Sequence, residues 1–272
     1  MLPNTKSIDA GPFLRFAIVL LVKSERQRFL RRLWKRSPGL MSVFGMCIKV
    51  KSYESLAEAS ALRFVARHTS IPVPKVYCAF IHKGRTYTVM SKINGKMACD
   101  GWKSRTEQSR QKILSQLREM VVELRSVSPP DGTGIGSVDN GPFYDCRLPS
   151  KFLWGPFTTT HDFHQALAND LDIDGHWTNL PDEIPELFQF YRESGTQLVL
   201  THGDLIMVEG DEVTGIIDWE TAGWFPSYWE YACAKNANPQ NAFWADEVDG
   251  FLEPMPYELK MEGIRRRYFG DF

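Results

Sequence analysis

The feature that most constrains how this chain can fold is a pair of aspartates that each follow an apolar run. They lie in the segment from Leu198 to Tyr231, where Asp204 follows the first run and Asp218 ends a later one. Between them, Glu209-Gly-Asp-Glu212 is typical of a hairpin turn. Adjacent strands that end in carboxylates can place both groups at the mouth of one cleft. The segment therefore predicts a short hairpin that delivers two acidic side chains to a shared site.

Paired carboxylates in one cleft suit phosphoryl transfer. One carboxylate can accept a proton from an attacking hydroxyl, and the other can hold a divalent metal ion. The alternative is that Asp204 and Asp218 are ordinary turn or cap residues. We favour the functional interpretation because the two aspartates occur in matching contexts.

The first hundred residues predict a small α+β unit. Ser42 to Val50 reads as a strand that contains a glycine, and Ser55 to His68 carries an apolar stripe at helical spacing. Ile71-Pro-Val-Pro ends that helix, because proline lacks the backbone donor and favours extended geometry before it. Lys75 to Ile81 and Arg85 to Ile93 then read as a hairpin.

The pattern changes near Asn94-Gly95, and the rest of the chain is mainly helical. Ser104 to Val127 has the spacing of a helix with one buried face, and further helices are expected at about residues 161–171 and 183–193 and after Pro226. We therefore expect an N-terminal extension with a helix over residues 1–40, a small lobe over 41–95 and a larger lobe over 96–272.

Composition excludes several classes of protein. The formal net charge of −1 gives no reason to expect nucleic acid or an anionic membrane as a partner. The apolar run from Phe13 to Val22 is about half the roughly 20 residues that a membrane span needs, so we expect a helix or strand packed on the domain. Five scattered cysteines fit idle thiols in a reducing compartment. We expect a cytoplasmic monomer.

The motifs resemble those of the aminoglycoside phosphotransferase family. His202-Gly-Asp-Leu205 followed by Gly215-Ile-Ile-Asp-Trp-Glu220 is similar to the paired signature of that family and of related choline-type and homoserine-type kinases. The segments Thr69 to Tyr77 and Ala222 to Tyr231 are similar to its fungal branch. The resemblance implies a two-lobed protein-kinase-like α+β fold, with a β-rich N-lobe for nucleotide and a helical C-lobe for the catalytic loop and acceptor.

The resemblance also implies roles, with ATP and Mg²⁺ as cofactors and a small-molecule hydroxyl as acceptor. Asp204 would be the catalytic aspartate that orients this hydroxyl, and Asp218 would bind the metal. Lys49 would contact the ATP phosphates, and Glu58 would pair with Lys49. The alternatives are a solvent-facing strand lysine, with Lys51 on the same strand face, and a first-turn glutamate favoured by the helix dipole.

The catalytic loop is shorter than the family pattern. Kinase loops read Asp-x-x-x-x-Asn, and the asparagine binds a metal ion. Here Leu205 runs directly into Ile206-Met-Val208, and no asparagine occurs between Asn179 and Asn236. We therefore expect weakened metal binding and poor catalysis. The alternative function is a catalytically inactive kinase-like protein that binds nucleotide or acts as a scaffold.

The acceptor cannot be identified from these residues. A cationic acceptor would need acidic and aromatic side chains across the cleft from the phosphates. Four candidates follow from position: Trp219, Glu220, Trp229 and Glu230. Each tryptophan is more simply explained as core. His202 is expected to be a structural histidine that bonds the loop backbone.

Overall fold

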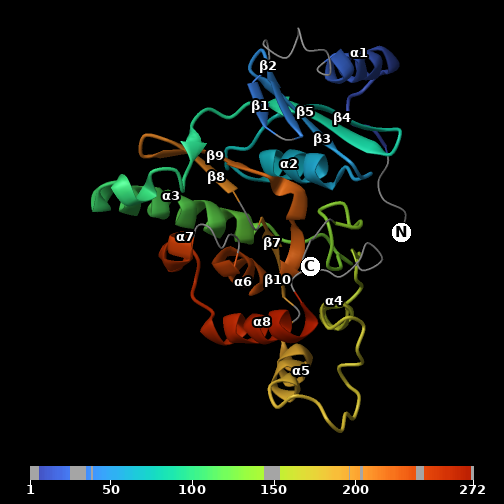
Figure 1. The fold of residues 1–272 in the computed structure, drawn as a ribbon, viewed down its shortest axis with the longest axis vertical. Helices are drawn as coiled ribbons and strands as arrows, with labels where there is room; N and C mark the ends of the chain where they lie inside the picture. Colours follow the sequence, from blue (N-terminus) through green and yellow to red (C-terminus); the bar gives the residue numbers. More distant parts are fainter. Residues whose placement is uncertain are drawn as a thin grey trace.

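The computed structural model describes residues 6–24, 35–37, 39–143, 154–195, 197–202, 205–236 and 242–270. Figure 1 shows a sheet-rich N-terminal lobe at one end of the molecule and a mainly helical C-terminal lobe at the other. The structure thus confirms the predicted α+β class, with a small antiparallel sheet before a helical part.

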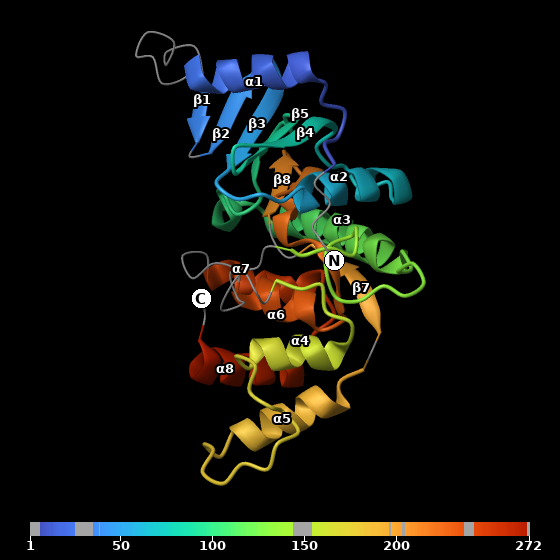
Figure 2. The same cartoon turned by 90° about the vertical axis from the view of Figure 1, so that its right-hand side faces the viewer.

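A five-stranded antiparallel sheet in the order β1-β2-β3-β5-β4 forms the N-lobe. Helix α1 (Pro12–Ser24) lies over one face and α2 (Ala57–His68) under the other (Figures 1 and 2). The strands are β1 (Lys35–Ser37), β2 (Leu40–Val43), β3 (Met46–Lys51), β4 (Val76–His82) and β5 (Arg85–Ser91).

The alternation of side chains along β3 decides where its lysines point. Ile48 packs with the α1 cluster, whereas Cys47 packs with Leu62 of α2. Because successive residues of a strand face opposite sides, Lys49 and Lys51 lie on the same face as Cys47. The alternation therefore turns both lysines toward α2.

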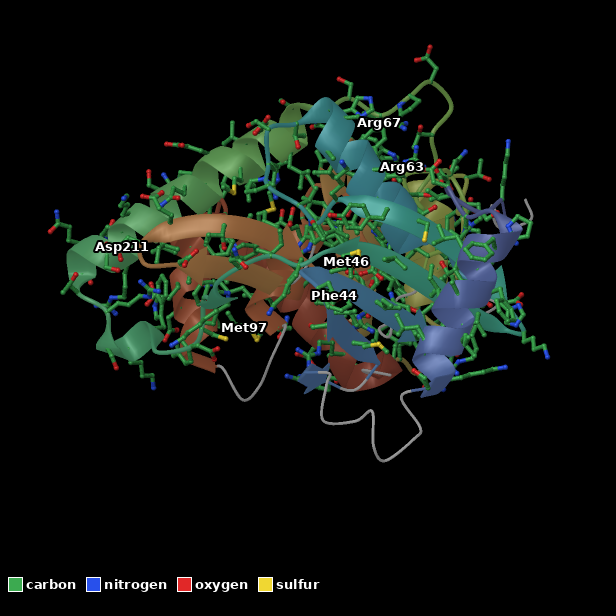
Figure 3. The ribbon with its side chains drawn as sticks, turned by 90° about the horizontal axis from the view of Figure 1, so that it is seen from above. Phe44, Met46, Arg63, Arg67, Met97 and Asp211 are labelled. Carbon is green, nitrogen blue, oxygen red and sulfur yellow. The ribbon has the colours of Figure 1, made fainter. Side chains whose placement is uncertain are left out.

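The structure corrects one predicted strand. Ser42 to Val50 was expected to form a single strand, but β2 and β3 are separate and pair through a turn at Phe44-Gly45. Both turn residues have positive φ, 47° and 75°, as tight hairpin turns use. Phe44 lies at the tip and is 91% exposed (Figure 3). The glycine after Phe44 therefore marks a turn between two strands and not an irregularity within one strand.

The apolar N-terminal run forms helix α1, as expected for a segment packed on the domain. Ile18 and Val19 are buried against the sheet, in contact with a cluster that includes Phe80. Within the described ranges, every helix is too short or too polar to cross a membrane.

A three-stranded sheet, β6-β8-β9, connects the lobes. Its strands are β6 (Lys96–Met97), β8 (Leu205–Glu209) and β9 (Glu212–Ile217). Gly95 enters it with φ +118°, and a Cβ there would lie 2.5 Å from the carbonyl oxygen of Val208. Only glycine fits so close an approach. The hairpin turn between β8 and β9 rests on α3, where Ser109 Oγ donates to Asp211 at 2.5 Å (Figure 3).

The C-lobe is built from helices around two cores, one rich in aromatic side chains. Strands β7 and β10 pair antiparallel beneath the hairpin, and fully buried Trp224 and Phe225 anchor β10. The elements are η2 (Trp102–Ser104), α3 (Glu107–Ser126), α4 (Thr160–Leu167), α5 (Ile184–Glu193), β7 (Leu198–Thr201), η4 (Trp219–Thr221), β10 (Gly223–Pro226), α6 (Trp229–Asn236), α7 (Ala242–Glu247), η6 (Val248–Gly250) and α8 (Pro256–Phe269).

The cysteines in the described part of the chain are free thiols. Cys47, Cys78 and Cys233 are buried, and Cys99 is partly exposed.

Candidate active site

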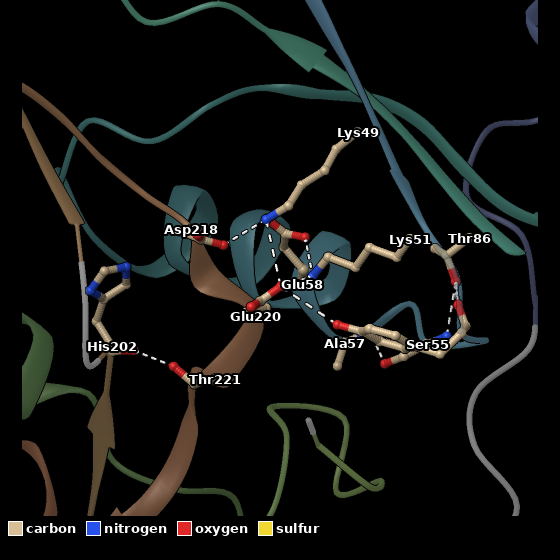
Figure 4. A network of polar contacts seen from close by, with 11 residues as sticks. Lys49, Lys51, Ser55, Ala57, Glu58, Thr86, His202, Asp218, Glu220 and Thr221 are labelled. Carbon is tan, nitrogen blue, oxygen red and sulfur yellow. Dashed lines mark hydrogen bonds and ion pairs between the residues drawn. The ribbon is translucent and has the colours of Figure 1, made fainter. Parts of the chain in front are cut away.

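The site begins with a buried glutamate on α2 that joins two lysines of β3. Glu58 lies in the first turn of α2 and is 5% exposed. Its Oε1 accepts from Lys49 Nζ at 2.8 Å, and its Oε2 lies 2.8 Å from Lys51 Nζ (Figure 4). One carboxylate therefore fixes both ammonium groups and ties the sheet to the helix.

Asp218 brings the hairpin of the C-lobe to the same lysine. It directly follows β9 and begins η4 with φ +64° and ψ +57°. Aspartate tolerates this left-handed conformation better than most residues. The conformation aims the carboxylate across the cleft, where Oδ1 accepts from Lys49 Nζ at 2.5 Å. The structure thus brings together Lys49, Glu58 and Asp218 from three separate elements.

Glu220 completes the polar cluster from η4. Its Oε2 pairs with Lys51 Nζ and lies 3.7 Å from Lys49 Nζ. Tyr53, just beyond β3, approaches the same oxygen with its hydroxyl at 3.5 Å. Two ammonium groups thus face three carboxylates, which leaves one net negative charge (Figure 4).

The carboxylates keep both lysines protonated despite their burial. Burial acts to lower the pKa of Lys49, but Glu58 and Asp218 offset this effect and the pKa is raised. The pKa of Lys51 is likewise raised, because Glu58 and Glu220 outweigh the desolvation. Both side chains therefore stay charged within the cluster at neutral pH.

His202 supports the backbone of the hairpin, as expected of a structural histidine. It is 6% exposed, and its Nε2 lies 2.8 Å from the carbonyl oxygen of Ile217, the residue before Asp218. Its backbone N–H donates to Glu230 Oε1 at 3.2 Å, and its carbonyl accepts from the Thr221 hydroxyl. His202 therefore links β7 to the start of η4.

Burial of His202 makes the stability of the fold depend on pH. Desolvation lowers its pKa to about 4, although the bond to Ile217 acts in the opposite direction. In an unfolded chain a histidine titrates near about 6.5, so the unfolded state binds the proton first and stability is lost as the pH falls between these values. We expect His202 to remove about 2 kcal/mol of unfolding free energy between about pH 7 and about pH 4.5.

Urea unfolding of wild type and His202→Gln at both pH values measures this effect. Glutamine keeps an amide donor but does not titrate, so the pH-dependent loss should shrink by that amount. His164, which is also buried with a pKa of about 4, contributes equally to both proteins. An unchanged loss in the variant would contradict the assignment.

Only part of the predicted catalytic loop lies within the described residues. Asp204 lies outside the described residues. Strand β8 begins at Leu205, which pairs with Ile217 in the antiparallel ladder. Since Ile217 precedes Asp218, the ladder starts directly beside the site.

Three of the four residues expected to bind the acceptor lie outside the lysine cluster. Trp219 is fully buried in the core, and its indole N–H donates to the Ile216 carbonyl at 2.9 Å. Trp229 is 2% exposed in the aromatic core of the C-lobe, and Glu230 is buried where it binds the His202 backbone. Glu220 alone of the four lies in the lysine cluster.

Comparison with known proteins agrees with this geometry. The profile of the family described as the phosphotransferase enzyme family (APH) matches residues 49–261, which is more than half of the chain. The chain belongs to this phosphotransferase family. The match begins at Lys49, the lysine that contacts both Glu58 and Asp218. No curated protein matches the phosphotransferase chain by sequence.

Solved structures share its fold. One is a thermostable mutant of the aminoglycoside phosphotransferase APH(4)-Ia in ternary complex with ADP and hygromycin B; its TM-score is 0.57 at 18% identity, with 90% of this chain and 87% of that chain covered. A second mutant of the same protein, with AMP-PNP and hygromycin B, gives a TM-score of 0.55 at 20% identity, with 83% and 78% covered.

Sequence reasoning missed Lys51 as a member of the polar cluster. Lys51 lies on the same strand face as Lys49, which also fits a solvent-facing strand lysine. The signal was present, because the two-residue period places both side chains on the face toward α2. Tyr53 carried no comparable signal, since it lies in a loop whose course the pattern does not determine.

Proposed function

We propose that this chain is an ATP-dependent phosphotransferase that moves the γ-phosphate to a hydroxyl of a small molecule. The observation that carries the proposal is the placement of Lys49 Nζ between Glu58 Oε1 at 2.8 Å and Asp218 Oδ1 at 2.5 Å. In this role Lys49 binds the nucleotide phosphates and Glu58 fixes its position. Asp218 is then the ligand of the metal ion that accompanies the phosphates.

The carboxylate of Asp218 fits Mg²⁺. Asp218 Oδ1 already faces a cation, since it lies 2.5 Å from Lys49 Nζ, whereas Glu220 Oε2 is paired with Lys51. Carboxylate oxygens with several waters are the coordination that Mg²⁺ prefers. When bound, the ion would neutralise charge on the transferring phosphoryl group. The protein residues would hold the phosphates in one orientation.

The acceptor side of the proposal rests on the C-lobe. Asp204 would orient the acceptor hydroxyl and accept its proton. The complexes of APH(4)-Ia with ADP or AMP-PNP and hygromycin B support a nucleotide and a small-molecule acceptor on this fold. We assign the nucleotide to residues 41–95 and the catalytic loop and acceptor to residues 96–272. The chain would act as a cytoplasmic monomer of the fungal branch of the family.

A second candidate function is nucleotide binding without transfer. Strand β8 begins at Leu205, directly after the position of Asp204, and no loop asparagine is present in the sequence. A misplacement of about 1 Å can lower a rate by about 100-fold. A short loop would then leave the N-lobe able to bind ATP while transfer is slow.

The melting temperature with and without Mg-ATP tests the nucleotide site. At about 100 times the dissociation constant a ligand stabilises the folded state by about 2.7 kcal/mol, so we expect an increase of several degrees. A second chain with four residues inserted after Leu205 and ending in asparagine restores the family spacing. Phosphate transfer to a panel of small hydroxyl compounds is measured for both chains.

The outcomes separate the two functions. Stabilisation with transfer by the native chain supports the phosphotransferase. Stabilisation of both chains with transfer only by the longer one supports a nucleotide-binding protein disabled by its loop. If Mg-ATP stabilises neither chain, the nucleotide site is absent and both proposals are wrong.

A further inference from the structure

We propose that Lys51 is a resident cation that takes the place of a second divalent metal ion beside the nucleotide phosphates. The site would then bind one metal ion rather than two. This inference rests on the proposed phosphotransferase function, which it deepens by assigning a residue to the charge balance of the site.

Three groups hold the ammonium of Lys51 in the polar cluster. Its side chain is 11% exposed, and its Nζ pairs with Glu58 Oε2 at 2.8 Å and with Glu220 Oε2. The ammonium also lies 5.5 Å from the centre of the Tyr53 ring, within the range of a cation–π contact. Three groups therefore converge on one positive charge. A solvent-facing strand lysine would have none of these contacts.

The asparagine that binds a metal ion in kinase loops is lacking in this sequence. Kinase-like sites hold two Mg²⁺ ions with an aspartate after the hairpin strand and an asparagine in the catalytic loop. The sequence has no asparagine between Asn179 and Asn236. Among the residues whose placement is described, no group of three histidine, cysteine or carboxylate side chains could hold a metal ion. A second ion would therefore lack one of its usual ligands, and another cation beside the phosphates could take its part in balancing their charge.

Lys51 and a second metal ion would compete for one carboxylate. Glu220 Oε2 lies 3.7 Å from Lys49 Nζ, but it is already paired with the ammonium of Lys51. A divalent ion at Glu220 would have to displace the ammonium or lie beside it, at a high electrostatic cost. Removal of Lys51 would free this carboxylate and change the net charge of the cluster from one negative charge to two.

The rest of the site tolerates this removal. Glu58 divides its oxygens between the lysines, so Lys49 keeps its contact with Oε1 when Lys51 is absent. Methionine matches the length of the lysine stem and can pack along the same path. Lys51→Met should therefore fold, and cooperative thermal unfolding confirms this before any titration.

The test is a titration with Mn²⁺, followed by electron paramagnetic resonance of the free ion, in the absence of nucleotide. We expect Lys51→Met to bind Mn²⁺ at least about tenfold more tightly than wild type, because a nearby positive charge is lost. Lys51→Arg keeps the charge and should stay within about twofold of wild type. Lys75→Met removes an exposed lysine from the same lobe, outside the cluster, and should change nothing.

Addition of AMP-PNP gives the second readout. Wild type should bind one Mn²⁺ per chain with the nucleotide, and Lys51→Met should bind two. Glu220→Gln in the Lys51→Met background should remove the second ion. Two ions in wild type, or an unchanged Mn²⁺ affinity in Lys51→Met, would overturn the inference. Loss of nucleotide binding in every variant would refute the proposed function, whereas the titration without nucleotide still decides the role of Lys51.

Discussion

Replacement of Lys49 by methionine is expected to lower kcat/KM for phosphate transfer by at least about 100-fold. Removal of one preorganised donor from a charged transition state costs on the order of 100- to 1,000-fold in rate. Lys49 is such a donor, because Glu58 and Asp218 hold its ammonium at 2.8 and 2.5 Å before any ligand binds. Its charge is aimed at the place where phosphoryl oxygens would lie in the proposed reaction.

The measurement uses steady-state transfer by the native chain, or by the chain with the restored loop if only that one turns over. Lys75→Met is the matched control, since it removes a lysine from the same lobe without contact with the cluster. Lys49→Met should keep its fold, because Glu58 remains paired with Lys51. Equal kcat/KM values for Lys49→Met and wild type would make Lys49 a structural lysine and refute its role.

The sequence predicted the fold class well because helices and strands depend on local patterns. The helix expected over Ser55 to His68 forms as α2, and the helix expected from Ser104 is α3. Lys49, Glu58 and Asp218 could be named because their order and spacing fit a family signature. The structure brings these three side chains into contact, and their functional roles remain predictions.

Other features depended on long-range packing that no local pattern encodes. The contact between Lys51 and Glu220 joins residues far apart in the sequence and depends on how η4 follows Asp218. The left-handed conformation of Asp218 sets the direction in which η4 leaves β9. The presence of an aspartate after an apolar run does not predict this conformation. Trp219 and Trp229 were ambiguous for a related reason, since an aromatic side chain near a site can equally be core.

Helix α8 holds a contact that no local sequence pattern predicts. Glu262 and Arg265 are spaced like an ordinary exposed pair on a helix, in the charged segment Met261-Glu-Gly-Ile-Arg265. The structure buries both, at 5% and 0% exposure. Two guanidinium nitrogens contact the two carboxylate oxygens at 2.9 and 2.7 Å, and a third donates to the Gly270 carbonyl at 2.8 Å. This geometry satisfies a fully buried arginine.

Loss of one partner of this pair should strongly destabilise the C-lobe. Glu262→Ala leaves the guanidinium of Arg265 buried without its carboxylate, and breaking a buried pair in this way costs about 3–5 kcal/mol. We expect that loss in the free energy of unfolding, measured by urea denaturation at neutral pH. The exposed pair between Lys260 and Glu186 is the control, and Glu186→Ala should cost less than about 1 kcal/mol.

The double variant Glu262→Leu/Arg265→Met distinguishes an unpaired charge from lost packing. A buried ion pair replaced by apolar side chains of similar volume is often close to neutral in stability, because the desolvation of both charges is relieved together. The double variant should therefore recover most of the stability that Glu262→Ala loses. Equal destabilisation of the two variants would show that the shape of the pair, rather than its charge, holds α8 against α5 and α6. Stability within about 1 kcal/mol of wild type in Glu262→Ala itself would show that Arg265 reaches water or another acceptor once its partner is removed.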